Sequence, residues 1–402
     1  MANTCVLAYS GGLDTSVAIG WLKDKFGFDV IALAVDVGQG VDHDALIAKG
    51  EACGATETIV VDAREEFARD FVLRALRANA LYMGKYPLVS ALSRPLIVRH
   101  LVRVARELGA TAVAHGCTGK GNDQVRFEVS AAALAPDIEV LAPVRDAGLT
   151  RDAAIAYAEE RGIPIPVTKA SPYSIDENLW GRTMECGVIE DPWVAPPADA
   201  YAWTTDPVAA PNDPETITIA FSSGAPVSVD GSELSLVELI ALVGERAGVH
   251  GVGRVDMIED RLVGIKSREI YEVPAALTLI GAHRDLEDLT LERSLAAYKR
   301  GVEPTYAELV YNGLWYSPLR LALDAFIDSS QRAVTGEVRV RLHKGTAVVE
   351  GRRSPKALYS HSLATYESGD LFDHDAAAGF VRLWGLPVKV WAEKQPQDED
   401  PA

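Results

Sequence analysis

The sequence predicts an α/β protein whose first half is built on an open parallel sheet, and two observations carry this prediction. Short, almost unbroken apolar segments such as residues 30–37 alternate with longer segments of helical periodicity. Strands that are apolar on both faces are typical of parallel sheets covered by helices on each side. A proline-rich connector over residues 191–215 then precedes a region that mixes alternating strands with helices, so a second, α+β domain is expected.

The elements of the first region follow in order along the chain. Strands are expected at TCVLAYS (4–10), DVIALAVDV (29–37), TETIVVDA (56–63), TAVAHG (111–116) and IEVLAPV (138–144). Helices are expected at 13–25, at 42–54, from Pro95 to Leu108, and from an N-cap at Thr150. Ligands of such sheets bind at the carboxyl ends of strands where the chain order reverses, which places residues 10–16 and 115–123 on one rim.

The second region is predicted from residue 216 onward. It begins with the alternating strand TITIAF and a hairpin turn through Ser222 to Gly224, and the next helix opens with a capping box at Ser235 and Glu238. Two further helices are expected at about 275–300 and 303–329, then strands within 337–353, an amphipathic stretch at 375–384 and a disordered end, QPQDEDPA. Apolar residues of the last segment favour either subunit contacts or packing within the domain: Phe372, Phe380, Leu383, Trp384 and Trp391.

Composition and charge narrow the classes of function. The chain has 402 residues and a formal net charge of −18, which argues against a large nucleic-acid interface and favours small substrates. Its four cysteines form no CxxC pair and its eight histidines no pair at ligand spacing, so no zinc or iron–sulfur site is expected. No apolar run approaches the roughly 20 residues of a membrane span. The N-terminus shows neither a basic segment nor a cleavage site, so we expect a cytoplasmic protein.

The segment SGGLDTS follows the first strand and has the composition of a phosphate-binding turn. Gly11 and Gly12 allow the backbone to approach a ligand closely, and the next helix presents free N–H groups. Hydroxyl groups come from Ser10, Thr15 and Ser16. The segment has neither the lysine of a Walker loop nor the dinucleotide pattern GxGxxG, so we expect a phosphate-binding turn of a different kind. A plain strand-to-helix turn is the structural alternative.

The segment HGCTGKGNDQVRFE (115–128) gathers glycines, amides and charges at the end of another predicted strand. Asp123 is suited to pair with an ammonium group, whereas Asn122 and Arg126 are suited to hold carboxylates or amides. The loop therefore favours a ligand that carries an amino group and carboxylates. A solvated surface loop is the alternative, and Lys120 is either a phosphate contact or a plain surface lysine.

Four motifs, in order, resemble the argininosuccinate synthase family: SGGLDTS, HGCTGKGNDQVRFE, SPYSIDENLWGRTMECG (171–187) and GVGRVDMIEDRLVGIKSREIYEVPA (251–275). The first also resembles the SGGxDS signature of ATP pyrophosphatases. The resemblance implies condensation of citrulline with aspartate through a citrulline-adenylate, which consumes ATP and gives argininosuccinate, AMP and diphosphate. It also implies Mg²⁺, a homotetramer, an adenine-nucleotide-alpha-hydrolase-like domain at 1–166, a synthetase domain at 167–365, and an oligomerisation helix with a tail at 366–402.

The same resemblance assigns residues to the three substrates. The ATP site would comprise Ala8, Tyr9, Ser10, Gly11, Gly12, Leu13, Asp14, Thr15, Ser16, Ala34 and Gly116. Aspartate would meet Thr118, Asn122 and Asp123, and citrulline would meet Tyr86, Asn122, Arg126, Ser174, Thr183, Glu259 and Tyr271. Two residues are the candidates for catalytic roles. Asp14 is expected to position metal or charge, and Asp123 either accepts a proton from the amine of aspartate or only orients it.

The match departs from the family at a few positions. Ala91 stands where the family often has serine, which puts a citrulline contact there in doubt, and neighbouring Ser90 either substitutes or does not. Thr183 stands where some relatives have serine, but it keeps a hydroxyl. His115 is expected to be a core or supporting residue.

Other interpretations remain open. Without the resemblance, Tyr86 would be assigned to packing, Glu259 to a solvated acid between two strands, and Ser174 and Thr183 to local caps. Rival functions of the same turn are a tRNA-thiolating or amide-forming adenylating enzyme and a non-catalytic nucleotide sensor. The missing CxxC and the lack of a basic surface weigh against thiolation.

Overall fold

The computed structural model describes residues 3–148, 151–164 and 173–395. The chain divides into two compact units, residues 1–356 and 357–402. The predicted N-cap at Thr150 and all but the first residue of the predicted disordered end lie outside the described residues. Within the described ranges, no helix is long and apolar enough to cross a membrane.

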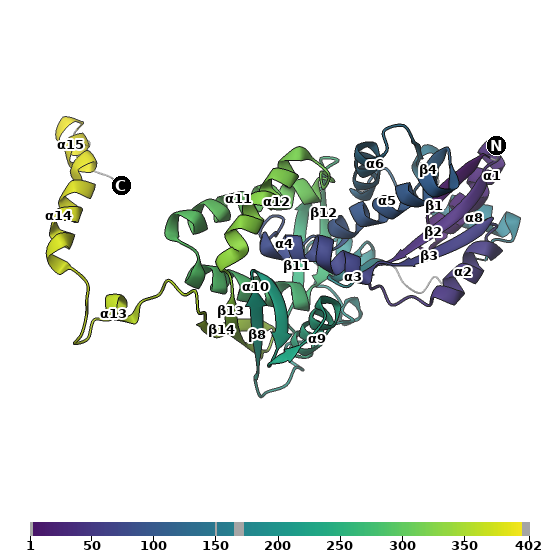
Figure 1. Ribbon diagram of the computed structural model, residues 1–402. Coiled ribbons are helices and arrows are strands. Elements are labelled where there is room, and N and C mark those ends of the chain that lie inside the picture. The colour runs from purple at the N-terminus through teal and green to yellow at the C-terminus, as the bar shows by residue number, and fades with distance from the viewer. Residues whose placement is uncertain (1–2, 149–150, 165–172, 396–402) are drawn as a thin grey trace. The chain divides into compact units, whose positions relative to one another are not determined.

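The first sheet of the larger unit is parallel, as its apolar strands predict, with the order β3-β2-β1-β4-β5. Figure 1 labels β1, β2, β3 and β4 of this sheet. Its strands are β1 (Thr4–Ala8), β2 (Asp29–Asp36), β3 (Glu57–Asp62), β4 (Ala112–Ala114) and β5 (Glu139–Leu141). Successive side chains of β1 belong to different cores, Cys5 and Leu7 to one face and Val6 and Ala8 to the other. The strand order reverses between β1 and β4, so the loops that follow these two strands share a rim.

Helices cover both faces of this sheet. On one face α1 (Leu13–Phe26) packs with α8 (Arg151–Arg161), and on the other α5 (Val89–Leu108) packs with α6 (Asp123–Leu134). The predicted start of α5 at Pro95 is wrong, because buried apolar residues continue upstream and offset the cost of a proline inside a helix. The remaining helical segments are α2 (His43–Ala52), α3 (Arg64–Phe67), η1 (Ala68–Val72), α4 (Leu73–Arg77) and α7 (Pro143–Asp146).

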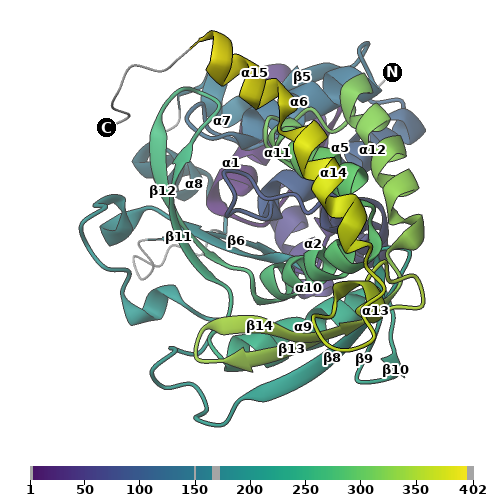
Figure 2. The same cartoon turned by 90° about the vertical axis from the view of Figure 1, so that its left-hand side faces the viewer.

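Two antiparallel sheets follow, and Figure 2 shows β13 and β14 of one of them beside β8. The five-stranded sheet has the order β10-β9-β8-β13-β14, and the four-stranded sheet has the order β11-β12-β7-β6. The predicted hairpin turn at Ser222–Gly224 joins β8 to β9. The strands are β6 (Ser174–Asn178), β7 (Gly181–Glu185), β8 (Glu215–Ser222), β9 (Ala225–Val229), β10 (Ser232–Glu233), β11 (Arg254–Asp260), β12 (Lys266–Glu272), β13 (Gly336–His343) and β14 (Thr346–Arg353).

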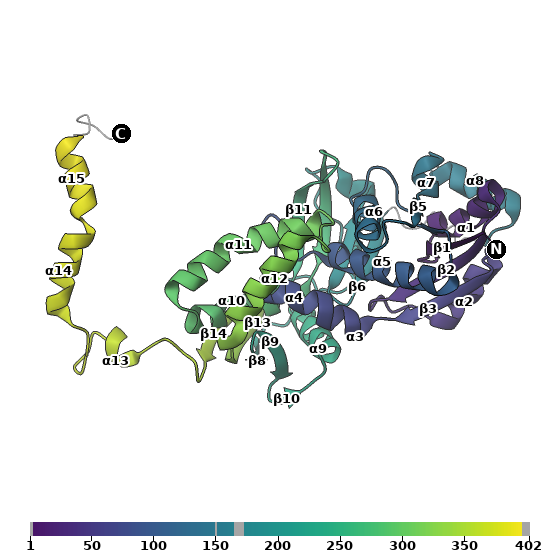
Figure 3. The same cartoon turned by 45° about the horizontal axis from the view of Figure 1, so that its top comes forward.

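The helices of the second region begin with the predicted capping box, in which Ser235 and Glu238 each accept the other's backbone N–H. The prediction of two long helices over 275–300 and 303–329 is wrong, because three helices occupy this stretch (Figure 3). Glu292 accepts the N–H groups of the first turn of the second helix, and Gly313, with a φ of 75°, follows its last turn. The helices are α9 (Leu236–Val249), α10 (Pro274–Thr290), α11 (Arg293–Tyr311) and α12 (Pro318–Ser330), with 3-10 turns at η2 (Gly187–Glu190), η3 (Ala198–Ala200) and η4 (Gln331–Ala333).

A buried ionic cluster joins the chain just after α4 to α10 and α11. Lys299 is 1% exposed, and its Nζ lies 2.9 Å from Glu303 Oε1 and 3.0 Å from Glu287 Oε1. Asn79 Nδ2 donates to both glutamates at 2.7 Å, and its Oδ1 lies 2.7 Å from His283 Nδ1. Burial lowers the pKa of His283, so its ring is neutral at pH 7. Charges at this depth are stable only when paired, so the cluster fixes how these helices meet.

The smaller unit contains α13 (His361–Ala364), α14 (His374–Trp384) and α15 (Leu386–Lys394). The predicted amphipathic stretch corresponds to α14, which begins after Asp373, whose side chain accepts the N–H of Ala376 at 3.0 Å. Phe380 and Trp384 stack with ring centroids 5.7 Å apart, and both rings are exposed. The apolar side chains of this unit therefore lie at its surface.

Candidate active site

The SGGLDTS segment connects β1 to α1 at the carboxyl end of β1. Gly11 has a φ of +74°, a left-handed conformation that glycine adopts without strain. Gly12 is the N-cap of α1, and Ser10 Oγ accepts its N–H at 3.3 Å and lies 3.2 Å from Thr15 Oγ1. Asp14 lies in the first turn of the helix, where the helix dipole favours an acid. Hydroxyls, backbone N–H groups and a carboxylate are thus gathered at one turn.

Residues from three neighbouring strand ends meet at this rim. Gly116, which follows β4, is so close to the turn that a Cβ on it would lie 2.9 Å from Thr15 Cγ2. Ala34 lies near the end of β2, and the Tyr9 N–H bonds the neighbouring Leu33 carbonyl at 2.8 Å. The other residues assigned to ATP differ in exposure: buried are Ala8, Tyr9, Gly11, Thr15 and Ser16, half-buried are Leu13 and Asp14, and exposed are Ser10 and Gly12.

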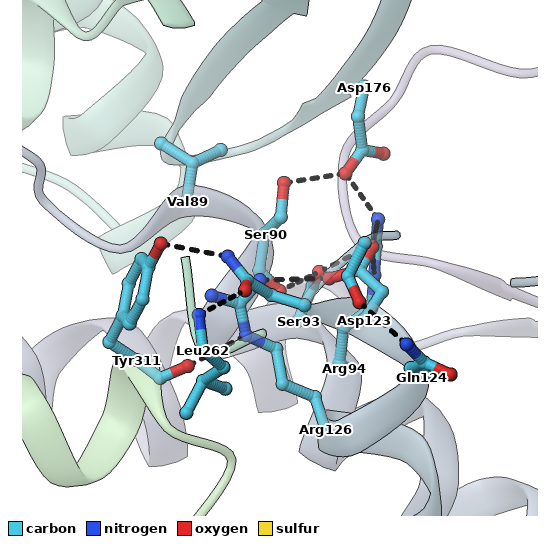
Figure 4. A network of polar contacts seen from close by, with 12 residues as sticks. Val89, Ser90, Ser93, Arg94, Asp123, Gln124, Arg126, Asp176, Leu262 and Tyr311 are labelled. Carbon is cyan, nitrogen blue, oxygen red and sulfur yellow. Dashed lines mark hydrogen bonds and ion pairs between the residues drawn. The ribbon is translucent and has the colours of Figure 1, made fainter. Parts of the chain in front are cut away.

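Arg94, from α5, is the centre of an ion-pair cluster (Figure 4). Its guanidinium donates from Nε to Asp123 Oδ2 at 2.9 Å and from Nη2 to Asp176 Oδ2 at 2.5 Å. Asp123 Oδ1 also accepts from Arg126 Nη1 at 2.8 Å. Burial alone would raise the pKa of Asp123, but the two arginines outweigh it and lower this pKa to about 2. Asp123 is therefore a carboxylate throughout the physiological pH range.

The carboxylate of Glu259, on β11, accepts hydrogen bonds from two tyrosine hydroxyls. Tyr271 donates to its Oε1, and Tyr311, the last residue of α11, donates to its Oε2 at 2.6 Å. The residue is 3% exposed, so it is not a solvated surface acid. Burial raises the pKa of Glu259, although the bond from Tyr311 and the charge of Arg126 oppose that rise. The Tyr311 hydroxyl also accepts from Asn122 Nδ2 at 2.8 Å, so Tyr311 links Asn122 of the second motif to Glu259 of the fourth.

Stacked tyrosine rings pack beside the Glu259 carboxylate. Tyr86 stacks on Tyr271 with centroids 4.3 Å apart, and its hydroxyl accepts the N–H of Ser90 at 3.0 Å. Tyr82 stacks on Tyr311 with centroids 3.6 Å apart. Tyr86 is thus both a packing aromatic and a neighbour of the site.

Arg126 is 4% exposed and points toward Tyr311, as Figure 4 shows. Its Nε donates to the Tyr311 carbonyl at 3.0 Å, and its Nη1 is engaged by Asp123. Its Nη2 is buried and has no hydrogen-bond partner among the described residues. An unsatisfied charged donor is costly, so this atom is suited to receive an anionic ligand group.

Three predicted residues lie apart from this network or join it through the backbone. The side chains of Ser174, at the exposed start of β6, and of Thr118, exposed after β4, make no hydrogen bond to it within the described ranges. Thr183 Oγ1 donates to the Asp176 carbonyl at 3.2 Å. The departure at Ala91 is a buried position in α5, and the hydroxyl of neighbouring Ser90 donates to Asp176 Oδ2 at 2.6 Å.

His115 forms hydrogen bonds with two other residues of the second motif, Cys117 and Glu128. It is 1% exposed, and its Nδ1 accepts the N–H of Cys117 at 3.2 Å, so its proton is assigned to Nε2. Nε2 faces Glu128 Oε1 at 3.3 Å, and this bond, with help from Arg145, lowers the pKa of Glu128. These contacts agree with a supporting role.

Sequence reasoning missed Arg94, Asp176 and Tyr311, although they form hydrogen bonds with five of the residues that it found: Asn122, Asp123, Arg126, Thr183 and Glu259. Arg94 and Asp176 are separated by 82 positions and Asn122 and Tyr311 by 189. The signal for Arg94 was a single charged residue among the uncharged residues that begin α5.

Comparison with known proteins gives the family. Two family models match the chain: the N-terminal HUP domain of arginosuccinate synthase over residues 4–164 and its C-terminal domain over residues 173–391. Argininosuccinate synthase of Ligilactobacillus salivarius is 58% identical over 394 residues, which cover 98% of each chain. That of Brevibacillus brevis is 60% identical over 388 residues, 96% of this chain and 93% of the relative. That of Oceanobacillus iheyensis is 59% identical over 385 residues, 96% of this chain and 92% of the relative. Because both halves match in order and over nearly the full length, the chain belongs to the argininosuccinate synthase family.

Proposed function

We propose that this chain condenses L-citrulline with L-aspartate to give argininosuccinate, with ATP converted into AMP and diphosphate, as a step of arginine biosynthesis. The observation that carries the proposal is the pairing, in one unit, of a lysine-free phosphate turn with a buried network of opposite charges. The turn suits the diphosphate part of a nucleotide. The network around Glu259, Asp123 and Arg126 suits ligands that carry both ammonium and carboxylate groups.

The reaction needs activation of citrulline. A ureido carbon is a poor electrophile because two nitrogens donate electrons to it, and its oxygen is a poor leaving group. In the proposed scheme the ureido oxygen attacks the α-phosphorus of ATP and diphosphate departs, which leaves a citrulline-adenylate. The α-amino group of aspartate then adds to the ureido carbon and loses a proton, and AMP departs with the former ureido oxygen. Alignment of the reacting groups and stabilisation of phosphate charge are the enzyme's main contributions.

Each charged residue of the network has a proposed task. Glu259 takes the ammonium group of citrulline, and the unpaired Nη2 of Arg126 takes its carboxylate. Tyr86, Ser174, Thr183 and Tyr271 complete the proposed citrulline site, and Thr118 with Asn122 completes the aspartate site. Asp123 orients the amine of aspartate, because a carboxylate whose pKa is lowered to about 2 by two arginines is a weak proton acceptor.

The phosphate turn is proposed to hold ATP together with Mg²⁺. The hydroxyls of Ser10 and Thr15, 3.2 Å apart, and the carboxylate of Asp14 in the first turn of α1 are the oxygen donors that this ion prefers. When bound, Mg²⁺ would neutralise charge on the phosphates. Ala34 and Gly116 line the same rim on either side of β1.

An isotope experiment tests the scheme directly. Citrulline labelled with ¹⁸O in the ureido group is incubated with the protein, aspartate and Mg·ATP, and the products are analysed by mass spectrometry. We expect equal amounts of AMP and diphosphate, with the label in the phosphate of AMP. Formation of ADP, or unlabelled AMP, would contradict the citrulline-adenylate. A nucleotide sensor would bind ATP and form neither product.

A pair of acidic variants tests the turn. Asp14→Ala should abolish turnover while the protein stays folded, because the variant loses the carboxylate of the proposed grip. Asp44→Ala is the matched control, since Asp44 is the acid in the first turn of the neighbouring helix α2. Normal activity of the first variant, measured as diphosphate release, would refute the role of Asp14.

We further propose a homotetramer that acts in the cytoplasm, with a nucleotide domain at 1–166, a synthetase domain at 167–365 and a C-terminal segment at 366–402 that contacts other subunits. The exposed rings of Phe380, Trp384 and Trp391 support that segment's role, because apolar surface of this kind favours burial against a partner. Light scattering should give the mass of four chains. A one-chain mass for the full-length protein would exclude the assembly, and a version ending at residue 365 should be smaller than a tetramer.

A further inference from the structure

The phosphate turn contains no lysine, but helix α2 places one against it. Lys49, in the last turn of α2, donates from Nζ to the Gly11 carbonyl at 2.5 Å. One helical turn earlier, Leu46 packs so closely that a Cβ on Gly11 would lie 2.7 Å from its Cδ1. Residues three apart lie on the same face of a helix, so α2 is fitted against the turn along this face.

The contact fixes the direction of one peptide group. The Gly11 carbonyl and the Gly12 N–H belong to the same trans peptide and therefore point in opposite directions. Since Lys49 draws the carbonyl toward α2, the N–H is directed away from α2, where it meets Ser10 Oγ at 3.3 Å. Two adjacent glycines have the greatest conformational freedom in the unfolded chain, so a turn made from them needs such an anchor.

We propose that Lys49 is a positioning residue of the diphosphate-binding turn. It comes from helix α2 and stands 38 positions after Gly11, outside the turn itself. It holds the Gly11–Gly12 peptide so that the Gly12 N–H faces the ligand. Its ammonium also polarises that peptide, which strengthens the Gly12 N–H as a hydrogen-bond donor to the bound phosphates. This inference rests on the proposed function, because it assigns a further residue to the same nucleotide site.

Three substitutions and one control test it. Lys49→Met and Lys49→Gln remove the charge, Lys49→Arg keeps it, and Lys23→Met is the control. Lys23, in α1, also donates from Nζ to a loop carbonyl, that of Gly54 at 2.8 Å, but it does not contact the turn. The readouts are kcat, the KM of each substrate, inhibition by diphosphate and the melting temperature.

For Lys49→Met and Lys49→Gln we expect the KM of Mg·ATP and the inhibition constant of diphosphate each to rise about 10-fold. The KM values of citrulline and aspartate should stay within about twofold of the wild type, Lys49→Arg should recover most of the loss, and Lys23→Met should behave like the wild type. Unchanged ATP and diphosphate constants, or an equal rise in all three KM values, would overturn the proposal. Wild-type turnover is measured first, so failure of the proposed function is seen separately from failure of Lys49.

Discussion

Replacing Glu259 with glutamine removes one negative charge from the site and changes its shape very little. Each oxygen of the carboxylate accepts a hydrogen bond from a hydroxyl group, one from Tyr271 and one from Tyr311. Glutamine offers a single oxygen, so one of the two hydroxyls loses its acceptor. The variant also cannot form a charged hydrogen bond with the ammonium group of citrulline, which is the task proposed for Glu259.

The size of the effect follows from the lost bond. A hydrogen bond to a charged group contributes about 1.5–3 kcal/mol, so the KM of citrulline should rise roughly 10- to 150-fold. The KM of Mg·ATP should change little, because the proposed nucleotide site lies at the rim of the parallel sheet, around the SGGLDTS turn. Initial rates of diphosphate release at varied citrulline provide the measurement, and thermal unfolding confirms that the variant is folded. A rise of less than about threefold in the KM of citrulline would refute the assignment of Glu259.

The pH dependence gives a second signature of the same residue. Burial raises the pKa of Glu259 above its ordinary value of 4.5, and only the ionised form binds an ammonium group. The value of kcat/KM for citrulline should therefore fall as the pH drops through this raised pKa, and Glu259→Gln should lack that limb. The free energy of unfolding depends on pH in the opposite direction to kcat/KM. The folded state holds the proton longer than the unfolded chain, so the penalty for ionising Glu259 grows as the pH rises above 4.5. A wild-type acid limb that persists unchanged in the variant would assign it to another group.

Three further variants probe residues that sequence reasoning missed or left unused. Tyr311→Phe removes the hydroxyl between Asn122 and Glu259 and should destabilise the fold by about 1–3 kcal/mol in urea unfolding while raising the KM of citrulline; a neutral effect on both would contradict the network. Arg94→Lys cannot hold both of its aspartates in the same geometry, so the KM of aspartate should rise about 10-fold or more, and an unchanged value would make Arg94 purely structural. Lys299→Met leaves two buried glutamates without their cation and should cost about 3–5 kcal/mol of stability, seen as a lower urea midpoint with unchanged KM values; a midpoint equal to that of the wild type would show that the cluster tolerates the loss.

The fold was predictable where one kind of side chain dominates an element. The apolar strand over 30–37 and the capping box at Ser235 carry their own signals, and both are confirmed. The break between α10 and α11 was missed because the helical period continues across it, and only the cap at Glu292 marks the new start. Strands β6, β7, β11 and β12 were not placed because charged residues replace the apolar alternation that identifies a strand.

The site was predictable where its residues are contiguous and could not be derived where they are not. Asn122, Asp123 and Arg126 stand within five positions of one another in a polar loop, so their side chains could be grouped from the sequence. The contacts of Arg94 with Asp176 and of Asn122 with Tyr311 form only when sheets and helices pack. No local pattern encodes such distances, and the raised pKa of a buried acid is likewise a property of its surroundings.

The amide of Asn122 has a consequence for how the two amino acids would meet. An amide carries two N–H donors and two acceptor lone pairs, and here Tyr311 takes one donor while the N–H of Leu262 takes one lone pair. Within the part of the chain that the structure describes, one N–H and one lone pair of this amide have no partner, which is enough to bind a carboxylate on one side and an amine on the other. A single side chain would thus bind both citrulline and aspartate, so a rotation of the Asn122 amide would change the hydrogen bonds of both substrates at the same time.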